Sequence, residues 1–212
     1  TMPDPKYFLR YFDLRARGEP IRMLFALAVV PFEEERFSLE AWPALKSTTP
    51  FGQVPVLLVD GEPLPQTNAI LRYLGKQFGF YGADAWEAAR IDAVTDQFVD
   101  FEYEYLHWMV ISLGYAPGDI EAVYKDEWLV SRAKHFPHFQ KILRESASGY
   151  LVGDKVSFID LLLATRMEVF EAMSPHPEEL YDGFPELKAH KEKIYGLPGL
   201  QKYLAERPPA RY

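Results

Sequence analysis

The chain has 212 residues, 48% of them apolar, and a formal net charge of −8. This charge argues against a nucleic-acid or anionic-membrane partner, because such partners attract basic surfaces. The chain contains no cysteine, which excludes disulfides, a cysteine nucleophile and thiolate metal sites, so any thiol chemistry must use a thiol carried by the ligand. Since neither a membrane-spanning apolar run nor a secretion signal is recognisable, we expect a cytoplasmic protein.

The first third of the chain mixes strands and helices. Aromatic residues are abundant over 7–13, which predicts a strand, and apolar residues recur at helical spacing over 19–28. Three further strands are predicted over 33–37, 54–59 and 62–64, and a helix over 66–78. The hairpin signal Asp60-Gly61 lies between the last two strands. We therefore predict an α/β domain over residues 1–79.

Strand patterns disappear after the Gly79–Gly82 linker. A long helix is predicted over 86–108, where apolar residues recur at alternating steps of three and four, and Pro117-Gly118 ends it. Further helices are predicted over 120–146, 157–173, 186–195 and 200–206. Pro137 predicts a bend or break, and Ser157 with Asp160 resembles a capping box. The second domain, residues 86–212, is expected to be all-helical.

Two segments of the first domain have ligand-binding potential. Val54 precedes Pro55 and is therefore predicted to be extended, so its backbone can pair with a peptide-like ligand. The alternative is a loop with a proline that opens a strand. At the start of the next helix, Gln66 and Thr67 can either cap the helix or present its N-terminus to a carboxylate.

The order of these segments resembles a known protein family. The segments are Tyr11 to Glu19, Trp42-Pro43 with Lys46, Pro50 to Pro55, and Gln66 to Ile70. Together they resemble the glutathione-binding half of a cytosolic glutathione transferase, most of all the sigma class, which includes the haematopoietic type of prostaglandin D synthase. Gly153 to Asp160 resembles the capping motif of the family's helical domain, so the likeness covers the whole chain.

The resemblance implies a thioredoxin-like first domain, a helical second domain and glutathione as co-substrate. It implies that the Val54–Pro55 bond is cis, that Val54 pairs with the cysteinyl part of glutathione, and that Gln66 and Thr67 bind the γ-glutamyl carboxylate. It also implies glycyl-end contacts from Trp42, Lys46 and Gln53. Lys46 suits this position because the glycyl group is a free carboxylate.

The resemblance further implies that the Tyr11 hydroxyl activates the thiol. Tyr7 has the same parity on the strand and is the obvious competitor, but the family motif at the end of the strand selects Tyr11. Arg17 matches an arginine near this hydroxyl. Sigma proteins commonly have Arg-Gly-Arg-Ala where this chain has Arg15-Ala16-Arg17-Gly18, which is expected to change the turn, and several relatives carry a basic residue in place of Gln53.

The predicted activity is conjugation of glutathione to electrophilic small molecules, a detoxification reaction. The residues expected on the co-substrate side are Phe12, Leu14, Trp108, Leu162 and Arg166. Arg166 either meets an acidic substrate or forms a salt bridge. The alternative functions are isomerisation of a prostaglandin endoperoxide and a non-catalytic role as lens crystallin or ligand carrier.

Asp92, Asp96 and Asp100 form an acidic stripe on the long helix. The stripe is either solvated or, as the resemblance implies, lies at the cleft of a homodimer, where Asp100 reaches the partner's glutathione and Arg72 and Lys76 supply opposite charge. Some prostaglandin-forming relatives bind a divalent metal through three aspartates of this region. Because Val99 stands at one of those positions, we predict no metal. The histidines at 135 and 138 flank Pro137 and are expected at the surface.

Overall fold

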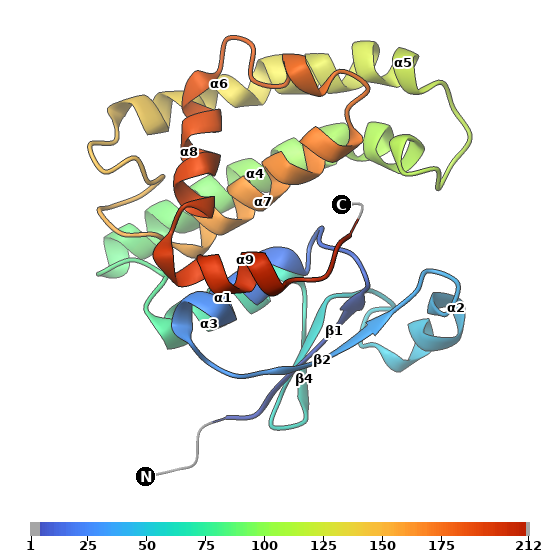
Figure 1. The fold of residues 1–212 in the computed structure, drawn as a ribbon, viewed down its shortest axis with the longest axis vertical. Coiled ribbons are helices and arrows are strands. Elements are labelled where there is room, and N and C mark those ends of the chain that lie inside the picture. Colours follow the sequence, from blue (N-terminus) through green and yellow to red (C-terminus); the bar gives the residue numbers. More distant parts are fainter. Residues whose placement is uncertain (1–4, 211–212) are drawn as a thin grey trace. The chain divides into compact units, whose positions relative to one another are not determined.

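The computed structural model describes residues 5–210 (Figure 1). The chain forms two compact units: residues up to Phe80 together with those from Leu197 onward, and Tyr81–Gly196. The residues from Leu197 onward were predicted to belong to the helical domain. In the structure they belong to the first unit, where Arg207 Nη1 lies 2.6 Å from a carboxylate oxygen of Glu19.

The first unit contains a four-stranded mixed sheet in the order β2-β1-β3-β4. The strands are β1 (Tyr7–Phe12), β2 (Glu33–Phe37), β3 (Val56–Val59) and β4 (Glu62–Pro65). β1 runs parallel to β2 and antiparallel to β3. β3 begins at Val56 rather than at the predicted Val54, since Pro55 has no N–H to donate to the ladder.

Helices α1 (Glu19–Ala28) and α3 (Thr67–Phe78) lie side by side on one face of this sheet (Figure 1). Alternate residues of β1 face them: the ring centroid of Tyr7 lies 5.2 Å from that of Phe25 and 5.9 Å from that of Phe78. Two short helices, α2 (Trp42–Leu45) and α9 (Gln201–Glu206), complete the unit, with 3₁₀ turns at Lys46–Thr48 and Pro198–Leu200. The predicted thioredoxin-like α/β domain is confirmed.

The second unit, Tyr81–Gly196, contains helices joined by loops and no strand. Its helices are α4 (Ala85–Ser112), α5 (Ile120–Val123), α6 (Leu129–Glu145), α7 (Phe158–Met173) and α8 (Pro185–Tyr195), with a 3₁₀ turn at Pro177–Glu179. Aromatic rings fill its core, and Trp108 stacks on Trp128 with centroids 4.4 Å apart. Over residues 5–210, none of the helices combines the length and the apolar character that crossing a membrane would require.

Two predictions in this unit differ from the structure. Helix α6 is not broken at Pro137, which is exposed, so water can satisfy the carbonyl that the proline leaves unpaired. The irregularity lies earlier, in a π-helical turn at Tyr124–Trp128. His135 is 2% exposed rather than superficial, and Gln97 bonds its Nδ1 at 2.9 Å. The other ring nitrogen, Nε2, lies 3.1 Å from a carboxylate oxygen of Glu104, so the buried imidazole has a polar neighbour on both sides.

The predicted capping box at the start of α7 is confirmed. The carboxylate of Asp160 accepts hydrogen bonds from the Ser157 backbone N–H at 2.8 Å and from its hydroxyl at 2.9 Å. The same carboxylate also accepts from the Leu151 N–H at 2.8 Å and lies 2.9 Å from His190 Nε2. Asp160 is fully buried, so this one side chain connects the loop before α7, the start of α7 and helix α8.

Candidate functional site

The carboxyl end of β1 presents Tyr11 to the turn that precedes α1. Tyr11 and Tyr7 lie on the same face of the strand, as predicted, but Tyr7 packs among core aromatic rings. The phenol oxygen of Tyr11 accepts a hydrogen bond from the backbone N–H of Arg17 at 3.1 Å. The ring is 5% exposed, so the protein fixes the position of this hydroxyl.

The turn before α1 is shaped to the Tyr11 ring. A Cβ atom at Gly18 would lie 2.5 Å from Cδ1 of Tyr11, so a side chain at this position would displace the ring. Ala16 takes the unusual φ of 28°. The order Arg15-Ala16-Arg17-Gly18 thus places glycine where the ring approaches, whereas Ala16 carries a side chain at a positive φ that favours glycine.

Arg22 lies beneath the same turn and was not predicted as a site residue. Its side chain is 1% exposed, and Nη1 donates to the carbonyl oxygen of Leu14 at 2.8 Å. Nε donates to the carboxylate of Glu34 at 2.9 Å, and the guanidinium carbon lies 5.9 Å from the centroid of the Tyr11 ring. The available sequence signal was an arginine in an apolar helix, three residues after Glu19.

A second group of predicted residues meets around the loop that leads into β3. The Val54–Pro55 bond is cis, as the resemblance implied. Gln66 Nε2 donates to Gln53 Oε1 at 3.5 Å, which joins this loop to the start of α3. Lys46 also reaches the loop, since a Cβ at Gly52 would lie 3.3 Å from Lys46 Cε. The Gln53, Gln66 and Lys46 side chains are exposed and accessible to a ligand.

The start of α3 has the form of a carboxylate site. Its N-cap residue is Gln66, and Thr67 is the first helical residue. The Gln66 side chain makes no capping hydrogen bond to this helix, which leaves the N–H groups of the first turn as candidate donors to a ligand. Gln66 has φ 76° and ψ 118°, a strained conformation for a residue with a side chain, and such strain is frequent at ligand sites.

The Phe12 ring contacts both Tyr11 and Trp42, and its centroid lies 5.6 Å from that of the Tyr11 ring. The centroid of the Trp42 ring lies 5.4 Å from that of Phe12, and its plane is stacked on Phe37 at 5.8 Å. Both Trp42 and Phe12 are half-buried, as is Leu14, whose carbonyl binds Arg22. Phe12 therefore has a packing role in the aromatic group around Trp42.

The other predicted co-substrate residues lie in the second unit and are buried there. Trp108 is fully buried against Trp128, Leu162 is 1% exposed, and Arg166 is 3% exposed. Arg166 Nη2 lies 2.6 Å from a carboxylate oxygen of Glu102, so the salt bridge considered as the alternative is present. The structure does not bring the five predicted residues together within either unit.

The acidic stripe of α4 is only partly solvated. Asp92 is half-buried and accepts a hydrogen bond from the Tyr81 hydroxyl at 2.5 Å, whereas Asp96 and Asp100 are exposed. On α3, Lys76 is exposed and Arg72 is half-buried. The stripe therefore leaves two of its three carboxylates at the surface.

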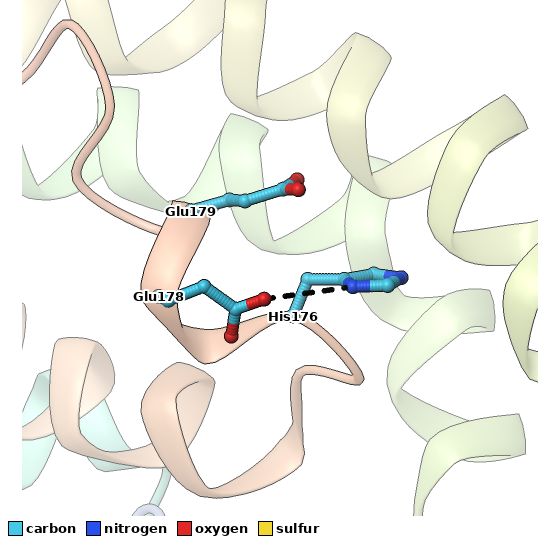
Figure 2. A group of neighbouring side chains, drawn as sticks. All are labelled: His176, Glu178 and Glu179. Atoms are coloured by element: carbon cyan, nitrogen blue, oxygen red, sulfur yellow. Dashed lines mark ion pairs between the residues drawn. The ribbon is translucent and has the colours of Figure 1, made fainter.

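One group among residues 5–210 has the spacing of metal ligands: His176, Glu178 and Glu179, whose donor atoms lie within 4.8 Å of one another (Figure 2). His176 Nδ1 lies 3.8 Å from Glu178, and Nε2 lies 3.2 Å from Glu121. The hydrogen bond to Glu121 raises the pKa of His176. Because both ring nitrogens already have carboxylate partners and the glutamates are exposed, surface ion pairing accounts for this group.

A thioredoxin-like unit with a cis-proline loop, an uncapped helix N-terminus and a tyrosine at a strand end, combined with an all-helical unit, is the architecture of a glutathione-binding enzyme. The chain matches the family described as Glutathione S-transferase, N-terminal domain, over residues 8–76, and the C-terminal domain family over residues 112–207. It is 42% identical to probable glutathione S-transferase 8 of Caenorhabditis elegans, covering 97% of this chain and 98% of the relative. The chain belongs to the glutathione S-transferase family and is a transferase that uses glutathione as co-substrate.

Three solved structures are similar over nearly all of the chain. The monomeric Na-GST-3 of the hookworm Necator americanus is 42% identical with a TM-score of 0.90, covering 98% of this chain and 100% of that one. A Nu-class transferase of Haemonchus contortus is 44% identical with a TM-score of 0.86, covering 99% and 100%. A prostaglandin D synthase of Nilaparvata lugens is 34% identical with a TM-score of 0.83, covering 97% and 100%.

Proposed function

We propose that Tyr11 performs the activating step of the transferase reaction by donating its hydroxyl proton in a hydrogen bond to the thiolate of glutathione. The observation that carries this proposal is the hydrogen bond of 3.1 Å from the Arg17 N–H to the Tyr11 oxygen. A phenol oxygen that accepts a hydrogen bond is a stronger donor itself. In the proposed complex, the Tyr11 hydroxyl donates its proton to a sulfur bound at the end of β1.

The energy required of this hydrogen bond is modest. A cysteine-like thiol has a pKa of about 8.5 and is mostly protonated at neutral pH. Lowering the thiol pKa by ~2 units corresponds to roughly 2.7 kcal/mol, which is within the range of a charge-assisted hydrogen bond and a nearby cation. The side chain of Arg17 is proposed to supply that cation.

We propose that the rest of glutathione lies along the loop before β3 and the start of α3. The first-turn N–H groups of α3, with the side chains of Gln66 and Thr67, would bind the γ-glutamyl carboxylate. The backbone of Val54 would pair with the cysteinyl unit. Lys46, Gln53 and Trp42 would surround the glycyl carboxylate, supported by the proximity of Lys46 to Gly52.

Three finer proposals concern class, assembly and location. We propose a sigma-type transferase, because the motifs from Tyr11 to Ile70 resemble that class. A Nu-class transferase shares the fold at 44% identity. We propose a homodimer in which Asp100 reaches the glutathione amine of the partner, and a cytoplasmic location, as expected for the cytosolic type. No metal is part of the proposed site.

The co-substrate is proposed to be an electrophilic small molecule. Of the residues predicted for it, Leu14 is half-buried and follows Tyr11 closely in the chain, and the Phe12 ring contacts the rings of both Tyr11 and Trp42. Trp108, Leu162 and Arg166 would contribute from the helical unit. Because all three are buried, we propose that they support the pocket rather than contact the co-substrate directly.

One alternative function has a specific observation in its favour. The similarity to a prostaglandin D synthase supports isomerisation of a prostaglandin endoperoxide, in which the same thiolate acts and is regenerated. A non-catalytic crystallin or carrier role is less well supported, because the hydroxyl of Tyr11 and the uncapped start of α3 are both retained.

A substrate panel tests these functions. Turnover of a generic aromatic halide with glutathione is expected for a conjugating transferase. Turnover of the endoperoxide without net consumption of glutathione would identify the isomerase instead. A protein that binds glutathione but converts neither substrate would contradict the proposal and favour the carrier role.

A further inference from the structure

We propose that Arg22 is a positioning residue for the transferase reaction: it holds the turn before α1 so that the Arg17 N–H meets the Tyr11 hydroxyl, and Arg207 supports it through Glu19. The proposal rests on the role proposed above for Tyr11. It adds that residues outside the glutathione site, one of them near the C-terminal end of the described chain, set the acidity of the bound thiol.

The turn between β1 and α1 is anchored at both ends by backbone hydrogen bonds. At its start, the Asp13 N–H donates to the Phe37 carbonyl at 3.0 Å. At its end, the N–H groups of Gly18 and Glu19 both donate to the carbonyl of Arg15 at 2.9 Å. Leu14 lies between these anchors, and its carbonyl is bound by the Arg22 side chain at 2.8 Å. Arg22 therefore acts on the segment that delivers the Arg17 N–H.

Arg22 can hold this carbonyl because its own position is fixed. The guanidinium is 1% exposed and donates through Nε to Glu34 of β2 at 2.9 Å, while Nη1 lies 3.6 Å from Glu19. A Cβ at Gly18 would lie 3.0 Å from Nη1, so the turn rests directly on the guanidinium. The planar fork of arginine serves the carbonyl and the carboxylates together, which a single ammonium group cannot do.

Glu19 extends the network to the C-terminal segment. It is 2% exposed, and Arg207 Nη1 lies 2.6 Å from one of its carboxylate oxygens. Burial and the negative charge of Glu19 raise the pKa of the neighbouring Tyr203, so that phenol stays neutral. Without Arg207 the buried carboxylate would lose its close cationic partner and keep the neutral Tyr203 and the longer 3.6 Å contact with Arg22, and a charge in this environment requires a close partner. Arg22 would then turn toward Glu19 and away from the Leu14 carbonyl.

The main test is Arg22→Lys, which keeps the charge but loses the fork. The pKa of the bound thiol is measured from the ultraviolet absorbance of the thiolate against pH at saturating glutathione. We expect this pKa to rise by about half a unit to one unit, with kcat lowered about three- to tenfold at neutral pH and the KM for glutathione little changed. A residue that only stabilised the fold would lower the melting temperature and leave the thiol pKa where it was.

Arg207→Gln provides a second test that does not depend on the stability of Arg22→Lys. It should also raise the thiol pKa, but by a smaller amount than Arg22→Lys does. Arg207→Lys should keep the thiol pKa close to that of the parent protein. Arg144→Gln is the matched control, because Arg144 also pairs with a glutamate at 2.6 Å but lies on α6. It should leave the thiol pKa unchanged.

Tyr11→Phe, measured in parallel, separates failure of this proposal from failure of the proposed function. If Tyr11→Phe leaves the thiol pKa unchanged, the role of Tyr11 is wrong. If Tyr11→Phe raises it whereas Arg207→Gln and a folded Arg22→Lys do not, only the positioning role is overturned. If Arg22→Lys does not fold, an unchanged thiol pKa in Arg207→Gln is by itself enough to overturn the positioning role.

Discussion

Tyr11 and Tyr7 share a strand and a face, and what distinguishes them is the environment of the hydroxyl. The Tyr11 oxygen accepts from the Arg17 N–H at the end of β1. Tyr11→Phe removes only this hydroxyl, so the fold and the affinity for glutathione should be retained. Because the lost hydrogen bond acts on thiolate formation, we expect conjugation to fall by about tenfold or more. Steady-state kinetics with an aromatic halide measures the loss.

The matched control is Tyr7→Phe. The Tyr7 ring lies among Phe25 and Phe78 in the core, and phenylalanine preserves those contacts. Its rate should stay close to that of the parent protein. A damaging Tyr7→Phe together with a harmless Tyr11→Phe would show that the motif was aligned to the wrong tyrosine.

The start of α3 allows a prediction on binding that is independent of catalysis. Gln66→Ala removes the side chain that bonds Gln53, and Thr67→Ala removes the first hydroxyl of the helix. Both should weaken glutathione binding by roughly tenfold or more, because each hydrogen bond to a charged group contributes about 1.5–3 kcal/mol. Calorimetric titration with glutathione alone measures the affinity. Unchanged affinity in both variants would contradict a γ-glutamyl carboxylate at this helix end.

At the level of the elements, Asp160 determines how α7 begins. Its buried carboxylate accepts hydrogen bonds from Ser157 and Leu151 and contacts His190. Asp160→Ala leaves these donors unpaired, so we expect a loss of about 3 kcal/mol or more in the free energy of unfolding. Denaturant unfolding measures the loss.

Glu145→Ala on α6 is the control for Asp160→Ala. Glu145 is exposed and its nearest cation, Lys141, lies 3.9 Å away, so the change should stay within about 0.5 kcal/mol. Similar losses in the two variants would show that the buried network contributes no more than a surface charge does.

The sequence predicted the elements that have strong periodicity or clear stop signals. The long helix and the capping box at Ser157 are examples, because apolar spacing and local hydrogen-bonding residues determine both. Helix α2, from Trp42 to Leu45, was not predicted, since so short a helix carries no repeating apolar pattern. Pro137 shows where a local signal misleads. A proline normally interrupts a helix, but here it is exposed to solvent and the rest of α6 is held by packing, so the helix continues.

The candidate site could be predicted as far as its motif extends along the chain. The cis bond at Val54–Pro55 and the position of Tyr11 at the end of a strand both followed from the motif. Arg22 did not, because its contact with the Leu14 carbonyl depends on the three-dimensional course of the turn. The burial of Trp108 likewise follows from its packing against Trp128, a residue on another segment.

For the whole molecule, surface composition bears on assembly. Several large apolar side chains are strongly exposed: Phe51 at 64% in the first unit, and Trp86 at 73% and Tyr103 at 74% on α4. The same helix carries the exposed Asp96 and Asp100. Apolar side chains exposed beside charges are typical of an interface with a polar rim. This composition supports the proposed homodimer, although the similar Na-GST-3 is monomeric.

The dimer proposal predicts a response to charge reversal. Two-fold pairing would set the acidic side of α4 against the first unit of the neighbour, where Lys76 on α3 is exposed. Lys76→Glu should therefore weaken the dimer, measured by light scattering on dilution, and high salt should weaken the parent dimer because exposed charge pairs are screened. The control is Lys188→Glu, which changes the net charge equally at an exposed residue of α8 and should leave the assembly intact. In the proposed dimer each glutathione site includes Asp100 of the other chain, so activity should fall as the dimer dissociates. A monomer near 24.5 kDa that still conjugates efficiently would contradict the proposal.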